Sequence, residues 1–227
     1  MSTVPYEIIE MEEAEYRNHP ALANTDIKNA QLLLLGKQPH TPKKALREGT
    51  MLHAAILEPH VWEQMGKRVP DKQASRIDRI AKTALNYPLL SELLEHPKVQ
   101  IEKCVFWKDP ITGLECKAKP DLFIEGEVVV DLKTTSRTWR DAFEKQVLRN
   151  DFDRQIAFYN IPLEAPIARV IGVSKVSKGR LFRLEWEKDD PYLKAGKEKA
   201  DILLKKLADT PELIEQAINL RSFKKRI

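Results

Sequence analysis

The sequence is poor in the residues that cross-link small secreted domains and in the apolar runs that cross membranes. Cys104 and Cys116 are its only cysteines, too few for a four-cysteine zinc or iron–sulfur site. We expect both to be reduced core residues in a reducing compartment. The longest apolar run, Leu32 to Leu35, is far short of the roughly 18 residues that span a bilayer. A membrane protein is therefore excluded, and a disulfide-stabilised domain is disfavoured.

The sequence also lacks a targeting signal and a strong excess of charge. Its first residues lead into an acidic stretch ending at Glu15, with neither the basic segment nor the apolar segment of a signal peptide, so we expect a cytoplasmic protein. The net charge is only +4, which means that any affinity for nucleic acid must come from where the charges lie. A length of 227 residues with 42% hydrophobic and 32% charged residues predicts one folded domain.

Periodicity predicts three parts within that domain. Residues 1–98 form an arm and helices, residues 99–190 form a sheet with a helix, and residues 191–227 form one long helix that leads into the basic tail from Arg221. Within the middle part, three extended runs separated by turn signals predict an antiparallel meander, followed by a helix after Asp151 or Asp153 and a hairpin. The runs are Val99–Trp107, Leu114–Ile124 and Glu127–Lys133. This order predicts the α/β class, with a mixed central β-sheet flanked by helices.

The third extended run carries the chemistry. Side chains alternate along a strand, so Asp131 and Lys133 share one face. A three-residue loop over Glu125–Glu127 would place Asp121 directly opposite Asp131, whereas a two-residue loop would turn the faces apart. Pro120 cannot donate to a β-ladder, so we expect the strand to be interrupted there. Two carboxylates this close repel unless a cation lies between them, and oxygen ligands suit Mg²⁺ or Mn²⁺. A structural ion pair would give the same Asp-x-Lys spacing.

These residues resemble a known family. Asp121, then Asp131-Leu-Lys133, then Gln155-Ile-Ala-Phe-Tyr159 are similar to the PD-(D/E)xK nucleases, in particular the RecB-like branch. The string Leu-His-Ala-Ala-Ile-Leu-Glu-Pro around His53, together with Lys-Pro-Asp-Leu around Asp121, resembles the RecE-type exonucleases of phage recombination, relatives of the phage lambda exonuclease. The resemblance implies a restriction-endonuclease-like core. It covers about Ala21 to Tyr159.

The resemblance also implies roles for individual residues. Lys133 would orient or deprotonate the attacking water, and Gln155 and Tyr159 would position the DNA strand or this lysine. Glu102 could add a further carboxylate, and Lys119 could contact a terminal phosphate. The implied metal ligands are His53, Asp121, Asp131 and the backbone carbonyl of Leu132.

Two further sets of residues are candidates for contact with DNA. Lys72, Arg76 and Arg79 lie at helical spacing in the most basic stretch of the chain, although a solvated helix face is the simpler interpretation. Residues near an expected helix start could hold a 5′ phosphate on free N–H groups. These weaker candidates are Asn24, Thr25 and Arg47.

The resemblance therefore predicts a Mg²⁺-dependent 5′ to 3′ exonuclease in a bacterial or phage-infected cell. It would act on double-stranded DNA ends, with Mn²⁺ able to substitute for Mg²⁺, and leave a 3′ single strand for a single-strand annealing protein. We expect a homo-oligomeric ring, with a trimer favoured, in which neighbours use the N-terminal arm, the apolar face of the helix after Pro191 and the tail from Arg221. The alternatives are another RecB-like enzyme, such as an endonuclease or a CRISPR-associated nuclease, and a catalytically silent DNA-binding module.

Overall fold

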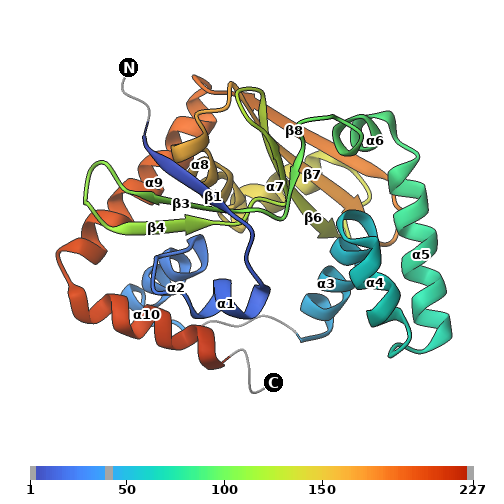
Figure 1. Cartoon of the computed structure of the whole chain (residues 1–227), viewed down its shortest axis with the longest axis horizontal. Helices are drawn as coiled ribbons and strands as arrows, with labels where there is room; N and C mark the ends of the chain where they lie inside the picture. The colour runs from blue at the N-terminus through green and yellow to red at the C-terminus, as the bar shows by residue number, and fades with distance from the viewer. Residues whose placement is uncertain (1–3, 39–42, 224–227) are drawn as a thin grey trace.

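The computed structural model describes residues 4–38 and 43–223 (Figure 1). The strands are β1 (Tyr6–Ile9), β2 (Gln100–Ile101), β3 (Cys104–Lys108), β4 (Glu115–Ala118), β5 (Leu122–Ile124), β6 (Val128–Thr135), β7 (Ile167–Ser174) and β8 (Leu181–Glu187). The helices are α1 (Glu13–Asn18), α2 (Asn24–Leu34), α3 (Lys43–Leu57), α4 (Pro59–Gly66), α5 (Asp71–Leu85), α6 (Pro88–Leu94), α7 (Arg140–Arg149), α8 (Phe152–Leu163), α9 (Pro191–Ala208) and α10 (Pro211–Phe223).

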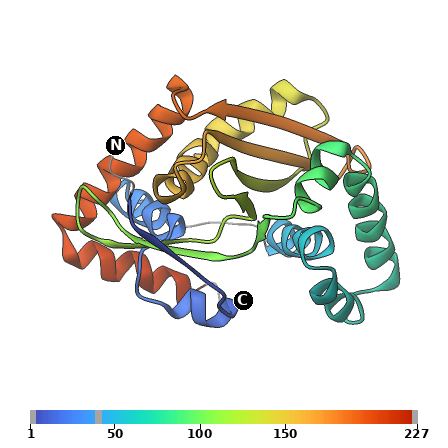
Figure 2. The same ribbon diagram turned by 45° about the horizontal axis from the view of Figure 1, so that its top comes forward.

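A five-stranded mixed sheet forms the centre of the molecule. Its order is β2-β5-β6-β7-β8, and only the β6–β7 pair is parallel. The odd and even residues of β6 divide between two cores, as alternation requires: Val129 packs with α7, α8 and α9, whereas Val130 and Leu132 pack with α3 to α6. Figures 1 and 2 show these two groups of helices on opposite faces of the sheet. The predicted mixed sheet flanked by helices is confirmed.

The predicted antiparallel order of the three extended runs is confirmed, but the first two runs are divided between two sheets, which was not predicted. A second sheet of order β1-β3-β4 includes a strand from the acidic N-terminal arm, and the chain crosses between sheets after Ile101 and again after Ala118. Glu102 has a φ of 53°, in the left-handed region, which ends β2. Pro120 lacks an N–H and interrupts the other run, as expected. The two crossings lie side by side, since the Glu102 N–H donates to the Asp121 carbonyl at 3.1 Å.

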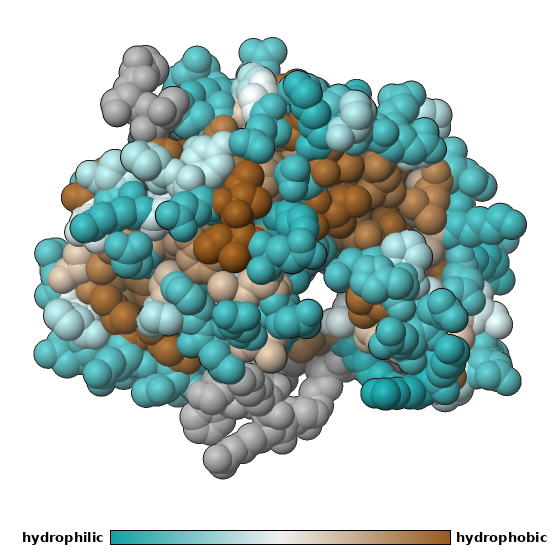
Figure 3. Space-filling model, in the orientation of Figure 1, coloured by the Kyte–Doolittle hydropathy of each residue, from teal (hydrophilic) through white to brown (hydrophobic). Residues whose placement is uncertain are grey.

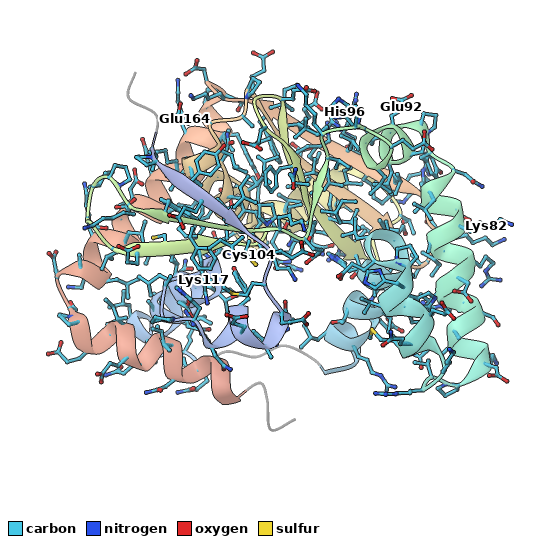
Figure 4. The ribbon with its side chains drawn as sticks, in the orientation of Figure 1. Lys82, Glu92, His96, Cys104, Lys117 and Glu164 are labelled. Atoms are coloured by element: carbon cyan, nitrogen blue, oxygen red, sulfur yellow. The ribbon has the colours of Figure 1, made fainter. Side chains whose placement is uncertain are left out.

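A buried lysine attaches α1 to the smaller sheet. Lys117 points from β4 toward α1 (Figure 4), where its ammonium donates to the carbonyls of Tyr16 and His19. Burial, followed by the nearby Arg221 charge, lowers the pKa of Lys117 to about 8. Cys104 and Cys116 on the same sheet are buried free thiols, as expected.

The C-terminal part is two helices where one was predicted. The chain turns at Asp209 and Thr210, and Pro211 opens α10 because its ring suits the first turn of a helix. The apolar face of α9 is buried within the chain, and Gly196 approaches the backbone of α8 where a Cβ would lie 2.5 Å from the Asp153 carbonyl. Arg221 binds Asp26 in α2. The arm and the apolar face expected to serve a neighbouring subunit are thus used internally, and the tail after residue 223 lies outside the described residues.

The surface is mostly polar and is hollowed at one place in this view. Figure 3 shows the hollow between the α1 region and the α3–α4 region. Within residues 4–38 and 43–223, no helix has the length and apolar composition needed to cross a bilayer.

Candidate active site

The turn before β6 brings two carboxylates together. Leu122 pairs with Val130 and Ile124 with Val128, so the loop has three residues and the register continues to Asp121 opposite Asp131. The Leu132 N–H donates to the Asp121 carboxylate. This is the three-residue alternative posed by the sequence, and it places Asp121 directly before the start of β5, opposite Asp131 in β6.

Lys133 and Asp131 form a buried ion pair on β6. The Lys133 Nζ lies 2.7 Å from Asp131 Oδ2 and 2.9 Å from Oδ1. Gln155 on α8 donates from Nε2 to Asp131 Oδ1 at 3.1 Å and to the Tyr159 hydroxyl at 2.6 Å. Burial, together with the neighbouring Asp121 charge, raises the pKa of Asp131 to about 6, although Lys133 opposes the rise. Four of the predicted site residues therefore form one connected network.

A second cluster lies beside this network. One ligand atom each from His53, Glu102 and Asp121 can lie within 4.8 Å of one another. His53 Nδ1 is 3.5 Å from Asp121 Oδ1. Burial works against ionisation of both groups, but their mutual attraction outweighs it: the pKa of His53 is raised and that of Asp121 is held below its usual range. The helix α3 thus delivers His53 to the carboxylates, as the resemblance implied.

This donor set fits a divalent cation. Two carboxylates and an imidazole offer the oxygen and nitrogen ligands that Mn²⁺ accepts, and the carboxylates are those that Mg²⁺ prefers. Burial and the adjacent Asp121 charge raise the pKa of Glu102 to about 7. Such a rise marks a site where negative charge is under-compensated by the protein alone.

Lys119 partly compensates that charge. Its Nζ lies 2.9 Å from Glu102 Oε2 and 3.0 Å from Glu13 Oε2 on α1. Despite burial, these two carboxylates raise the pKa of the lysine above its usual value. Lys119, predicted to contact a terminal phosphate, is therefore engaged by protein carboxylates. The contact with Glu13 was not predictable from sequence, because it depends on how α1 packs.

The other two predicted metal ligands, Asp131 and the Leu132 carbonyl, are not among the three residues of the cluster. Asp131 Oδ1 accepts hydrogen bonds from Lys133 and Gln155, whereas the buried Oδ2, 2.7 Å from Lys133 Nζ, has no hydrogen-bond partner among the described residues. The role of Asp131 as a metal ligand stays a prediction. The Leu132 N–H points toward Asp121, and a strand directs the N–H and C=O of one residue to the same edge. The Leu132 carbonyl therefore faces the same edge of β6 as its N–H, and its role as a ligand stays a prediction.

The predicted DNA-binding residues on α5 are not equivalent. Lys72 and Arg79 are exposed, but Arg76 is held by Glu48 of α3 at 3.0 Å. Glu48 also binds Lys175 at 3.0 Å. One of the three charges is therefore already neutralised within the fold.

The weaker candidates for a phosphate site differ in whether another protein group binds their side chains. Asn24 accepts a hydrogen bond from the buried Arg154 at 3.3 Å, so its side chain is used inside the protein. Thr25 and Arg47 are exposed and their side chains remain available.

Comparison with known proteins agrees with this geometry. A family model described as "PDDEXK-like domain of unknown function (DUF3799)" matches residues 27–176, about two thirds of the chain. No curated protein matches the chain in sequence.

A solved structure with a TM-score above 0.5 shares the fold at low sequence identity. A protein of Eubacterium rectale, whose assignment as an exonuclease is provisional, superposes with a TM-score of 0.63 at 16% identity, over 93% of this chain and 87% of that one. A phage-related exonuclease from Haemophilus somnus 129PT gives 0.46 at 11% identity, with 89% of each chain covered. An alkaline exonuclease from Laribacter hongkongensis gives 0.43 at 14% identity, over 91% of this chain and 93% of that one.

Proposed function

Because the chain belongs to the family of PDDEXK-like domains, we propose that it is a metal-dependent nuclease that hydrolyses phosphodiester bonds in DNA. The observation that carries the proposal is the convergence of Asp121, Asp131 and Lys133 at the open end of β5 and β6, with His53 arriving from α3. A purely structural ion pair would explain Asp131 and Lys133. It would not explain a histidine and a second and third carboxylate beside them.

The residues divide the chemistry between them. His53, Glu102 and Asp121 would hold a divalent cation, which lowers the pKa of the attacking water and offsets charge on the phosphate oxygens. Asp131 fixes the Lys133 ammonium at the edge of that cluster, where the lysine can orient the water or accept its proton. Gln155 holds Asp131 through one N–H and leaves the network anchored to α8.

The finer features of the proposal follow the resemblance to RecE-type exonucleases. We propose Mg²⁺ as the ion, with Mn²⁺ as a substitute, and digestion of double-stranded ends from 5′ to 3′. The product would be a 3′ single strand that a single-strand annealing protein takes up in the cytoplasm of a bacterial or phage-infected cell. A trimeric ring would keep such an enzyme on its substrate between steps.

A labelled-substrate assay tests the proposal. We expect linear duplex to be degraded with Mg²⁺, closed circular plasmid to survive, and a 5′ end label to be released before a 3′ end label. EDTA and the substitution Lys133→Met should each abolish degradation. Cleavage of the circle would instead indicate an endonuclease. Binding of duplex without any cleavage by the wild type would indicate a silent DNA-binding module.

A further inference from the structure

A cationic pocket with an exposed tryptophan lies outside the site described above. Trp139 is 69% exposed, although large aromatic side chains are normally buried. It lines a surface cavity of about 830 Å³ together with Arg140, Arg180 and Arg183, and with two acidic residues, Asp141 and Glu185. The cavity lies where the start of α7 meets β8, which is the edge strand of the larger sheet.

The arginines of this pocket are largely uncompensated. Among the described residues, the side chains of Arg180 and Arg183 have no ion pair, and Arg140 reaches only the Arg183 carbonyl, at 3.5 Å. Glu185 is neutralised by Arg169, whose Nε lies 2.6 Å away. The pocket therefore presents three guanidinium groups against a single unpaired carboxylate, that of Asp141.

A short loop, held in place by hydrogen bonds, connects the pocket to the proposed catalytic strand. Residues 136–139 leave the end of β6 directly after the strand that carries Lys133. This loop is tied to the β7–β8 turn, because the Ser174 hydroxyl donates to the Arg137 carbonyl at 2.8 Å and the Lys175 N–H donates to the Thr135 carbonyl at 2.8 Å. Both sides of the pocket thus originate at the carboxyl ends of the parallel strands β6 and β7.

We propose that this pocket binds single-stranded DNA, with a base stacked on Trp139 and the phosphates held by Arg140, Arg180 and Arg183. An exposed indole offers a flat face to any unpaired base, and guanidinium groups bind phosphate oxygens in a planar fork. A duplex hides its base faces, so it cannot use the indole in this way. The assignment rests on the proposed nuclease function, and it gives the strand that survives digestion a place to bind.

Binding of a labelled oligonucleotide tests the proposal. The probe is fluorescein-labelled oligothymidine, titrated in EDTA so that no cleavage occurs and followed by anisotropy. We expect Trp139→Ala and the double variant Arg180→Ala/Arg183→Ala each to weaken binding by about tenfold or more, with a lower salt dependence for the double variant. Trp139→Phe keeps an aromatic face and should bind within about threefold of the wild type. Arg149→Ala, an exposed arginine at the other end of α7, is the matched control and should bind normally.

Tryptophan fluorescence gives an independent signal. Trp62 and Trp107 are buried and Trp186 stacks on Tyr192, so Trp139 is the tryptophan available for stacking on a base. The probe should quench the emission of the wild type but not that of Trp139→Ala. Circular dichroism and a thermal unfolding curve confirm that each variant is folded.

Three results would overturn the assignment. Unchanged oligothymidine binding in both pocket variants is the first, and absence of quenching is the second. The third is an equal loss of affinity for blunt duplex, which would mean that the pocket binds DNA without preference for single strands. The proposed function fails by a different observation, namely no cleavage of duplex DNA by the wild type in Mg²⁺, and that result leaves the oligothymidine titrations unaffected.

Discussion

Replacing Lys133 with methionine should make the stability of the protein depend on pH in a way that the wild type does not. Methionine fills a similar volume, so the change removes the charge without opening a large cavity. The Asp131 carboxyl is only 1% exposed and loses the ammonium that lay 2.7 Å away. Burying a carboxylate without a compensating charge lowers the stability of the folded protein. Protonation of the carboxylate removes that charge and limits the loss.

The pKa of Asp131 sets the size of the effect. This pKa is about 6 with Lys133 in place, so at pH 8 protonation costs about 3 kcal/mol, since each pH unit corresponds to about 1.4 kcal/mol. That figure is the ceiling on the destabilisation at pH 8, and at pH 6 the ceiling falls below about 1 kcal/mol. Because the folded variant then holds a proton that the unfolded chain releases, its stability relative to wild type falls as the pH rises.

Thermal unfolding in EDTA at the two pH values measures this difference. For a chain of this size we expect the midpoint of Lys133→Met to lie about 5–10 °C below wild type at pH 8 and close to wild type at pH 6. The double variant Lys133→Met/Asp131→Asn removes the orphaned charge and should lose the pH dependence. A midpoint shift of equal size at both pH values would refute the account of a buried, ion-paired Asp131.

The metal cluster, the C-terminal anchor and the assembly give further predictions. Mn²⁺ or Mg²⁺ at a hundred times its dissociation constant should stabilise the protein by about 2.7 kcal/mol, and Glu102→Gln should remove most of that gain in a calorimetric titration. Arg221→Ala leaves the buried Asp26 unpaired and should cost about 3–5 kcal/mol in urea unfolding, against less than about 0.5 kcal/mol for the exposed control Arg149→Ala. Light scattering at micromolar protein should give three times the chain mass of 26.2 kDa; a mass near that of one chain would defeat the ring.

The strand that carries Asp131 and Lys133 was predictable because the features that determine it lie close together in the sequence. Alternation of side chains along β6, the length of the loop at Glu125–Glu127 and the missing N–H of Pro120 are all encoded within about fifteen residues. With a three-residue loop, one of the two lengths that the sequence left open, they place Asp121, Asp131 and Lys133 as the structure has them. Gln155 on α8 was predicted from the resemblance to RecB-like nucleases, and the structure places it on Asp131.

The contacts that sequence reasoning missed depend on partners distant along the chain. Glu102 adopts a left-handed conformation that no glycine or asparagine signals, so the switch between two sheets was not foreseen. Arg76 looked free because Glu48, on another helix, is recognised as its partner only once α3 and α5 are packed. By contrast, the break between α9 and α10 had a visible signal in Thr210-Pro211 that the expectation of one long helix passed over.

The paired crossings between the two sheets have a mechanical consequence. Glu102 and Asp121 are the residues at which the chain passes from one sheet to the other, and one backbone hydrogen bond joins them. His53 reaches this seam from α3, on the far side of the larger sheet from α7 to α9. An ion held by these three side chains would cross-link the two sheets at this junction. This cross-link would add to the apolar core that the two sheets share. Rotation of one sheet against the other would change the positions of the ligands around the ion, so binding of the ion would oppose that rotation.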